Sequence, residues 1–329
     1  MIKRTIAIWV VMLFLAMPLK AQEFAPVGSA VSQFLEIGMG ARAIAMGEAY
    51  TAVTNDAGAA FWNPAGLVDI EKRNFYLAYN QWPADISLGG ISMAMNLGNM
   101  GTIGVSGIFL NTDDMEVTTV DAPQGTGETF GISNYAAGIS YSRFLTNRLS
   151  VGVTGKIVHE GYMDYDYTTW AVDIGTVYRT EFRNMRIGMS ILHFGPEVQF
   201  NGDFIDFSDP RSVDVDEPKS FQTYSLPVNF RIGFNIDVWR AGRNGIITAM
   251  DMVHSNNNLE TYNWGLEYSF SEMVFLRGGY RLNLDEGGLT LGAGARFNWF
   301  AENDAHIDYA FSDRGVVANI HRFSLGVSF

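Results

Sequence analysis

Cysteine is absent from all 329 residues of the chain. This absence excludes disulfide bonds, thiolate metal sites and cysteine nucleophiles. Histidine is scarce, with five scattered residues at positions 159, 193, 254, 306 and 321. None of them lies at the close spacing that places metal ligands on one element, so we expect neither a metal nor a cofactor.

Charged residues are also few, and acidic residues outnumber basic ones. Charged residues make up 17% of the chain, hydrophobic residues 47%, and the formal net charge is -13. An acidic chain of this kind is a poor partner for nucleic acid. The solvated acidic loops fit no EF-hand spacing, so a calcium site there is the less favoured interpretation.

Long apolar runs are missing as well, since none reaches the roughly 20 residues that a membrane-spanning helix needs. The nearest case is the N-terminus, where Lys3 and Arg4 precede an uncharged apolar run over residues 5–17. With Ala21 offering a small residue for cleavage, residues 1–21 are predicted to be a cleavable signal peptide. Residue 22 is glutamine and not cysteine, which argues against a lipoprotein.

Apolar residues are instead spread by alternation from about Asn74 onward. In residues 289–300 the odd positions are apolar, from Leu289 to Trp299, whereas the even positions are mostly small or polar. Residues 230–238 and 262–270 show the same pattern. Side chains on a strand alternate between two faces, so each segment predicts one apolar face and one polar face.

Counting such segments predicts about fourteen strands. They lie near residues 74–80, 86–97, 101–110, 132–144, 148–160, 166–180, 184–194, 223–238, 244–254, 259–270, 273–282, 288–300, 303–312 and 319–329. Short turns alternate with longer polar loops, as in bacterial outer-membrane barrels. The predicted fold is an all-β transmembrane antiparallel barrel in the cell outer membrane.

The last residues alternate strictly and end on an aromatic residue. Phe323, Leu325, Val327 and Phe329 resemble the terminal-strand signal that the barrel-assembly machinery recognises. Aromatic residues also fall near predicted strand ends, where they would meet lipid headgroups. These are Tyr141, Phe144, Trp170, Tyr178, Trp239, Tyr262, Trp299 and Phe329.

Residues 34–67 do not alternate and are rich in alanine and glycine. They predict two short helices. Asn55 or Asp56 would cap the second helix at its N-terminus. Pro64 would end it, because a proline favours extended geometry at the preceding residue, Asn63. Gly38, Gly40 and Ala43 imitate a dinucleotide fingerprint, but no strand leads into them. Small residues of this kind suit a compact plug inside a closed wall.

The sequence from Leu35 to Tyr50, then Asp56 and residues 62–67, resembles the N-terminal signature of the PorV/PorQ family of outer-membrane proteins. More distantly, its Asn-Pro-Ala is similar to the hatch motif of FadL-type transporters. The resemblance implies a monomeric fourteen-stranded barrel over residues 71–329 with a lumenal plug, or hatch, over residues 22–70. The plug residues it singles out are Gly38, Gly40, Arg42, Gly47, Asp56, Asn63, Pro64, Ala65 and Gly66.

The resemblance implies two functions that stay open. One is a conduit or receptor for hydrophobic or amphipathic molecules, and the other is a type IX secretion accessory that binds and shuttles cargo proteins at the cell surface. A barrel hydrolase is the third possibility. It is disfavoured because no nucleophile motif accompanies His159 or His254, so we expect no enzyme.

Basic residues occupy the predicted inward positions of the strands. They are Lys156, Arg179, Arg186, Arg231, Arg277, Arg281, Arg296 and Arg322. In the favoured interpretation they pair with Glu36, Glu48 and Asp56 of the plug and with Asp173, Asp237 and Glu267 of the wall, because buried charge must be compensated. In the other they form a path for anionic head groups.

Overall fold

The computed structural model describes residues 27–82, 86–204, 218–284, 287–298, 303–315 and 319–329. The predicted signal peptide, Trp299 and residues 205–217 of the second long loop lie outside the described residues.

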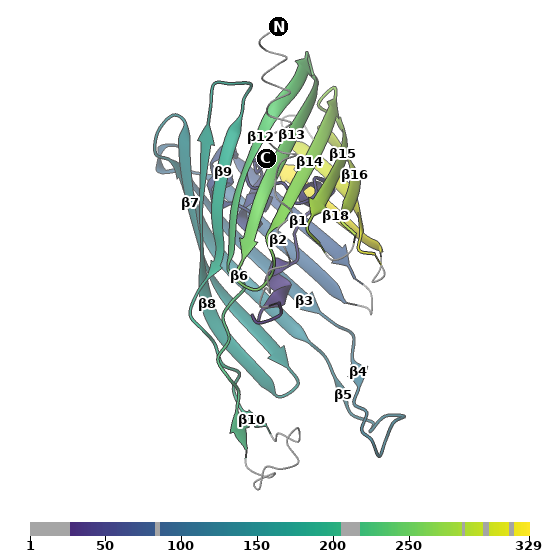
Figure 1. Ribbon diagram of the computed structural model, residues 1–329. Coiled ribbons are helices and arrows are strands. Elements are labelled where there is room, and N and C mark those ends of the chain that lie inside the picture. The colour runs from purple at the N-terminus through teal and green to yellow at the C-terminus, as the bar shows by residue number, and fades with distance from the viewer. Residues whose placement is uncertain (1–26, 83–85, 205–217, 285–286, 299–302, 316–318) are drawn as a thin grey trace.

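Fourteen strands close into an antiparallel barrel, as the alternation predicts (Figure 1). Each pairs with its neighbours in the chain, and the last pairs with the first from Asn74–Ser328 to Gln81–His321. The wall strands are β1 (Arg73–Gln81), β2 (Ser87–Asn96), β3 (Thr102–Asn111), β6 (Ser133–Phe144), β7 (Leu149–Tyr162), β8 (Tyr165–Arg179), β9 (Arg186–Phe194), β12 (Asn229–Ala241), β13 (Asn244–Ser255), β14 (Thr261–Phe270), β15 (Val274–Leu282), β16 (Leu289–Asn298), β17 (Asp304–Asp313) and β18 (Asn319–Ser328).

One strand boundary differs from the prediction by several residues. β12 begins at Asn229 and not near residue 223. Pro227 has no backbone N–H for a sheet ladder, and Tyr224 and Ser225 instead bridge to Val198 and Ala30.

Two small hairpins in the long loops were not predicted. β4 (Met115–Glu116) pairs with β5 (Thr129–Phe130), and β10 (Asp203–Phe204) pairs with β11 (Lys219–Ser220). Both project from the long-loop end of the barrel, which lies at the bottom of Figure 1.

The wall has an apolar outer face. Leu289 and Leu291 are exposed while Thr290 between them is buried. The aromatic residues predicted to meet lipid headgroups are also exposed wherever the structure describes them, from Tyr141 to Phe329. No helix in the described part of the chain is long and apolar enough to cross a membrane.

Residues 33–69 fill part of the lumen and are called the plug below. Four short helices replace the two predicted: η1 (Gln33–Glu36), α2 (Ala41–Ala45), η2 (Ala57–Phe61) and η3 (Pro64–Asp69). Only α2 is α-helical, and it has five residues. Alanines such as Ala41, Ala45 and Ala65 are fully buried, so the small side chains let these turns pack against the wall and each other.

Helix capping differs from the prediction at one position. Asp56 precedes η2, but its side chain accepts no capping hydrogen bond. Asn63 caps η3 instead, because its Oδ1 accepts a bond of 3.1 Å from the Ala65 amide, while Pro64 begins the helix.

Candidate functional site

One side of the plug touches the wall through its backbone. A Cβ on Gly152 of β7 would lie 2.3 Å from the Pro64 carbonyl carbon, and one on Gly175 of β8 would lie 2.0 Å from Asn63 Oδ1. The Asn63 amide donates to the carbonyls of Thr51 at 2.8 Å and Thr176 at 3.1 Å. Helix η3 is therefore seated on glycines of the wall.

The other side of the plug makes a tight turn at Gly47 and Glu48. Both have positive φ, 63° and 62°. A Cβ on Gly47 would lie 2.7 Å from the Trp264 carbonyl oxygen and 2.8 Å from the Tyr280 amide nitrogen. Only glycine fits at position 47, since the close approach excludes a side chain and the positive φ disfavours one.

Three other plug glycines are crowded by side chains rather than by the wall backbone. A Cβ would lie 2.6 Å from Ile44 Cδ1 at Gly38, 2.0 Å from the Tyr76 hydroxyl at Gly40, and 2.1 Å from Thr54 Oγ1 at Gly66. These contacts account for small residues at 38, 40 and 66 by packing alone.

A chain of buried charges joins α2 to β14, β15 and β17. Arg42 of the plug binds Glu267 through two hydrogen bonds of 2.9 and 3.0 Å. Glu267 also accepts from Arg277 at 2.6 Å, and Arg277 donates to Asp308 at 2.6 Å. Burial lowers the pKa of Arg42, but the Glu267 carboxylate outweighs it and holds that pKa well above its usual value.

A second set of charges surrounds the turn at Glu48. Its carboxylate accepts from Arg281 at 2.7 Å, and its carbonyl accepts from Arg231 at 2.6 Å. Burial raises the pKa of Glu48, but Arg281, Arg314 and Arg231 outweigh it, so this pKa lies below its usual value. Asp251 of β13 completes the set by accepting from the amide of Thr51 at 2.9 Å.

Asp69 is an ion-pair partner that the sequence analysis missed. It ends η3 and pairs with both Arg179, at 2.5 Å, and Arg186. The signal available was its position at the end of the plug segment, immediately before the first strand.

Three predicted acid partners are not used as expected. Glu36 accepts from Asn229, Ser255 and Asn257 and from no arginine within the described residues. Asp56 lies 3.9 Å from His306, and Asp237 pairs with Arg240 of its own strand at 3.0 Å. Arg296 lines the lumen over the ring of Phe275, with 5.6 Å between its guanidinium carbon and the ring centre.

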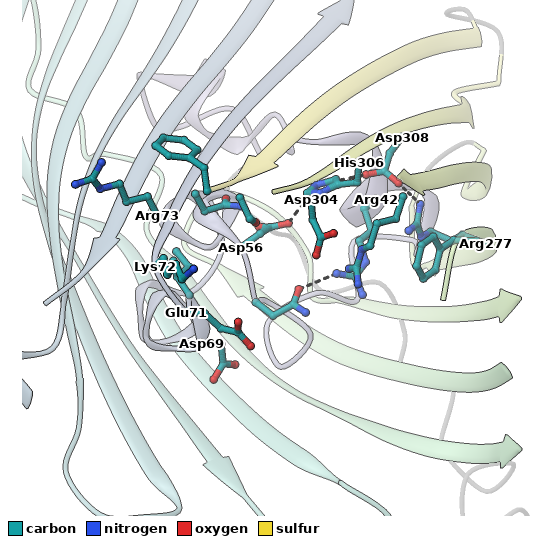
Figure 2. Close-up of a pocket in the computed structure, with 17 residues that line it drawn as sticks. Arg42, Asp56, Asp69, Glu71, Lys72, Arg73, Arg277, Asp304, His306 and Asp308 are labelled. Atoms are coloured by element: carbon teal, nitrogen blue, oxygen red, sulfur yellow. Dashed lines mark hydrogen bonds and ion pairs between the residues drawn. The ribbon is translucent and has the colours of Figure 1, made fainter. Parts of the chain in front are cut away.

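At the short-turn end of the barrel, the lumen opens beside the plug into a polar vestibule. One part has a volume of about 410 Å³ and is lined by Arg42, Asp56, Arg277 and His306 among others (Figure 2). A neighbouring hollow of about 350 Å³ shares Arg42 and Arg296 with it. The vestibule is lined by charged groups from both plug and wall.

On the other side of the plug lies a small inner cavity of about 50 Å³. Its apolar lining comes from both plug and wall and consists of Leu35, Ile37, Met39, Ala60, Phe61, Trp62, Ile108, Ala136, Ala137 and Leu192. Polar residues also line it, namely Glu36, Ser106, Thr154, Lys156, Asp173, His193, Asn229 and Arg231. Three of them form one cluster, in which the Lys156 Nζ lies 2.8 Å from Asp173 and 2.6 Å from His193 Nδ1.

The wall ladder is interrupted beside this cavity. Val172 pairs with Phe194 and Ile174 with Ile191, so that Leu192 and His193 stand opposite Asp173 alone. His193 has a φ of 62°, and its amide donates to the Asp173 carboxylate at 2.7 Å in place of a ladder carbonyl. This is a β-bulge, which bends a strand and leaves one residue unpaired.

The histidines that were weighed as catalytic candidates lie on the outer face or in a loop contact. His159 stacks on Tyr135 with 4.8 Å between ring centres, and His254 pairs with Glu260 at 3.0 Å. In the described part of the chain, no group of three or more histidines and acids is arranged to hold a metal ion.

No protein-family model matches the chain, and no curated protein matches it. Solved structures do resemble it. They include a FadL homologue from Pseudomonas aeruginosa (13% identity, TM-score 0.56, covering 84% of this chain and 94% of that one). The toluene transporter TodX of Pseudomonas putida gives 11% identity, a TM-score of 0.55 and coverage of 86% and 96%.

The toluene transporter TbuX of Ralstonia pickettii is similar over 94% of this chain and 98% of its own, with 12% identity and a TM-score of 0.54. At these identities the likeness shows the fold alone, a closed antiparallel barrel. It lends no support to the PorV/PorQ resemblance, which stays a prediction.

Proposed function

We propose that this chain is an outer-membrane barrel that conducts hydrophobic or amphipathic small molecules, with the plug closing its lumen. The observation that carries the proposal is the inner cavity, because plug and wall together enclose a space with an extensive apolar lining beside an interrupted strand ladder. Protein sites for small apolar ligands are enclosed spaces with few polar groups. The toluene transporters of similar fold support the same substrate class.

The proposed route leaves the cavity through the wall between β8 and β9. An apolar molecule that continued toward the short turns would have to pass the buried charges of Arg42, Glu267 and Arg277 and enter the polar vestibule. Beside the bulge, by contrast, the apolar outer face carries Ile174, Ile191 and Phe194, all exposed. The lateral route therefore keeps the molecule in apolar surroundings.

A disulfide across the bulge tests this route. The chain has no cysteine, so Val172→Cys with Phe194→Cys introduces one unique pair at register partners. Oxidation should lower uptake of a labelled monoaromatic hydrocarbon at least tenfold in proteoliposomes, and reduction should restore it. Tyr135→Cys with His159→Cys, a pair on β6 and β7, is the matched control. Equal uptake by the oxidised and reduced bulge pair would refute the lateral route.

A second candidate function is the secretion accessory. Two observations favour it: the PorV/PorQ-like sequence of residues 35–67, and the two hairpins that project from the long-loop end (Figure 1). Native mass spectrometry of the protein extracted gently from its own outer membrane separates the two functions. A retained lipid-like ligand without a protein partner supports the conduit, whereas a co-purified surface protein or secretion pore supports the accessory.

A further inference from the structure

Three arginines gather around the plug at the long-loop end of the lumen. Arg281 lies on β15, Arg322 on β18, and Arg314 in the connection between β17 and β18. We call them the arginine cluster. The Glu48 carboxylate of the plug accepts from Arg281 at 2.7 Å and lies 3.8 Å from Arg314.

Within the part of the chain that the structure describes, the charges of the arginine cluster are not balanced. Glu48 is the one carboxylate paired with any of its members among the described residues. Burial lowers the pKa of Arg314, and the neighbouring Arg281 lowers it further in spite of Glu48. Buried charges normally have full compensation, so the excess of positive charge here calls for an anion.

Hydrogen-bond donors of the cluster are also unused. Arg322 is fully buried, and among the described residues only its Nη1 has a partner, Ser312 Oγ at 2.6 Å. Its Nε and Nη2, the Nε of Arg281 and the indole Nε1 of Trp82 are buried without an acceptor in the part of the chain that the structure describes. The guanidinium carbon of Arg322 lies 6.0 Å from the Trp82 ring, so these donors belong to neighbouring side chains. Buried donors without a partner destabilise a folded protein, and charged ones do so most.

We propose that the arginine cluster, with Trp82, is a binding site for an anionic group, a carboxylate or a phosphate, which competes with Glu48. Such a group would supply both the missing charge and the missing acceptors, and Arg–carboxylate and Arg–phosphate bonds are among the strong ones. The Arg314 side chain is 27% exposed and connects the cluster to solvent.

Binding at the cluster has a consequence for the plug. Arg281 is the closest partner of the Glu48 carboxylate, and the turn at Gly47 and Glu48 has positive φ at both residues. An anion that takes Arg281 from Glu48 removes the bond that holds this turn to β15. This consequence rests on the proposed function, because it makes an anionic amphiphile the signal that loosens the plug. The binding site itself does not depend on the proposed function.

Direct binding to the purified full chain in detergent tests the site. The probes are octanoate, inorganic phosphate and octanol, and the readouts are calorimetric titration and hydrogen exchange of residues 41–51. We expect saturable binding of octanoate, of phosphate or of both, with faster exchange at 41–51, and weak binding of octanol. Octanoate alone would indicate an amphiphile site, and phosphate alone would indicate a phosphate site. Octanol binding as well as octanoate, or no saturable anion binding, would overturn the proposal.

Variants assign the binding to the cluster. Arg322→Gln should weaken anion binding at least tenfold, and Glu48→Gln should strengthen it by removing the competitor. Arg240→Gln, an arginine at the short-turn end with a 57% exposed side chain, is the matched control. Should Arg322→Gln fail to fold, Trp82→Phe removes one donor and keeps the ring, and it should weaken binding severalfold. Equal binding in wild type, Trp82→Phe and Glu48→Gln would refute the assignment.

The uptake assay keeps this inference separate from the proposed function. Anion binding without hydrocarbon uptake would leave the site standing and remove the conduit. Uptake without anion binding would do the opposite.

Discussion

The two sides of the plug meet the barrel through different combinations of packing and charge. On β7 and β8, helix η3 is pressed against Gly152 through its backbone and against Gly175 through the Asn63 and Pro64 side chains, and Asp69 at its end pairs with Arg179 and Arg186. On β14 and β15, the charged side, the Gly47 turn also approaches wall backbone, and buried ion pairs hold it and helix α2, through Arg42 with Glu267 and Glu48 with Arg281. Close-packed contacts have no alternative partner, whereas an ion pair can exchange one partner for another.

This difference indicates which side of the plug can move. The close contacts of η3 with Gly152 and Gly175 are lost only when the whole helix moves away from the wall. We therefore expect η3 to be the fixed side of the plug. The charged side can be released by a competing ion while β1, which follows η3 directly, stays in the wall. Variants on the two sides of the plug should therefore affect hydrogen exchange in different segments.

The largest effect is expected for Glu267→Gln. This carboxylate neutralises both Arg42 and Arg277, whose side chains are 15% and 3% exposed. Removing one partner of a buried pair costs about 3–5 kcal/mol because a buried charge is left uncompensated. Hydrogen exchange of residues 41–51 should accelerate strongly, while residues 63–69 stay protected.

The control for that variant is Glu272→Gln, which breaks an exposed pair with Arg243, where the side chains are 51% and 69% exposed. Exposed pairs contribute about 0–1 kcal/mol, so little should change. Equal acceleration at 41–51 and 63–69 in Glu267→Gln would show that the plug moves as one body.

Gly152→Ala should act on the opposite side of the plug. Its Cβ would lie 2.5 Å from the Ala65 amide nitrogen, so η3 must shift. Overpacking typically costs about 1–3 kcal/mol. Exchange should increase at residues 63–69 and not at 41–51. Gly155→Ala on the same strand meets nothing within 4 Å and is the matched control.

Much of the fold could be predicted because a barrel wall separates lipid-facing from lumen-facing side chains at a period of two. Thr290 between Leu289 and Leu291 shows how directly that period reports burial. The same rule placed Arg231, Arg277 and Arg322 on the inner face, where all three are buried. The even strand count followed from the same alternation.

The partners of those arginines could not be predicted, because alternation gives the face of a residue and not its height in the barrel. Height depends on the register of every strand, which places Asp69 beside Arg179 and Arg186 and leaves Asp56 near His306. The bulge at His193 was invisible for a similar reason, since one extra residue in β9 changes no apolar period that a short strand can reveal.

Asn63→Ala should give a smaller effect on the η3 side. The buried amide caps η3 through Ala65 and donates to Thr51 and Thr176. Loss of a cap costs about 1 kcal/mol, and the carbonyls left behind add to it. Denaturant unfolding in lipid vesicles, followed by tryptophan fluorescence, should show the loss. Asn99→Ala, at an exposed turn, should leave the midpoint unchanged.

The smallest effect is expected from pH, and it should fall on the charged side alone. The pKa of Glu48 is lower in the folded protein than its usual value, since Arg281, Arg314 and Arg231 outweigh burial. A carboxylate of this kind contributes stability above its usual pKa, and that contribution is lost as pH falls through the folded value. Exchange at residues 41–51, corrected for intrinsic rates, should therefore rise between pH 7 and pH 3 more than exchange at 63–69. Glu48→Gln should reduce that excess, because it removes the carboxylate that pairs with Arg281. An unchanged excess in Glu48→Gln would show that the Glu48 carboxylate does not carry the pH response.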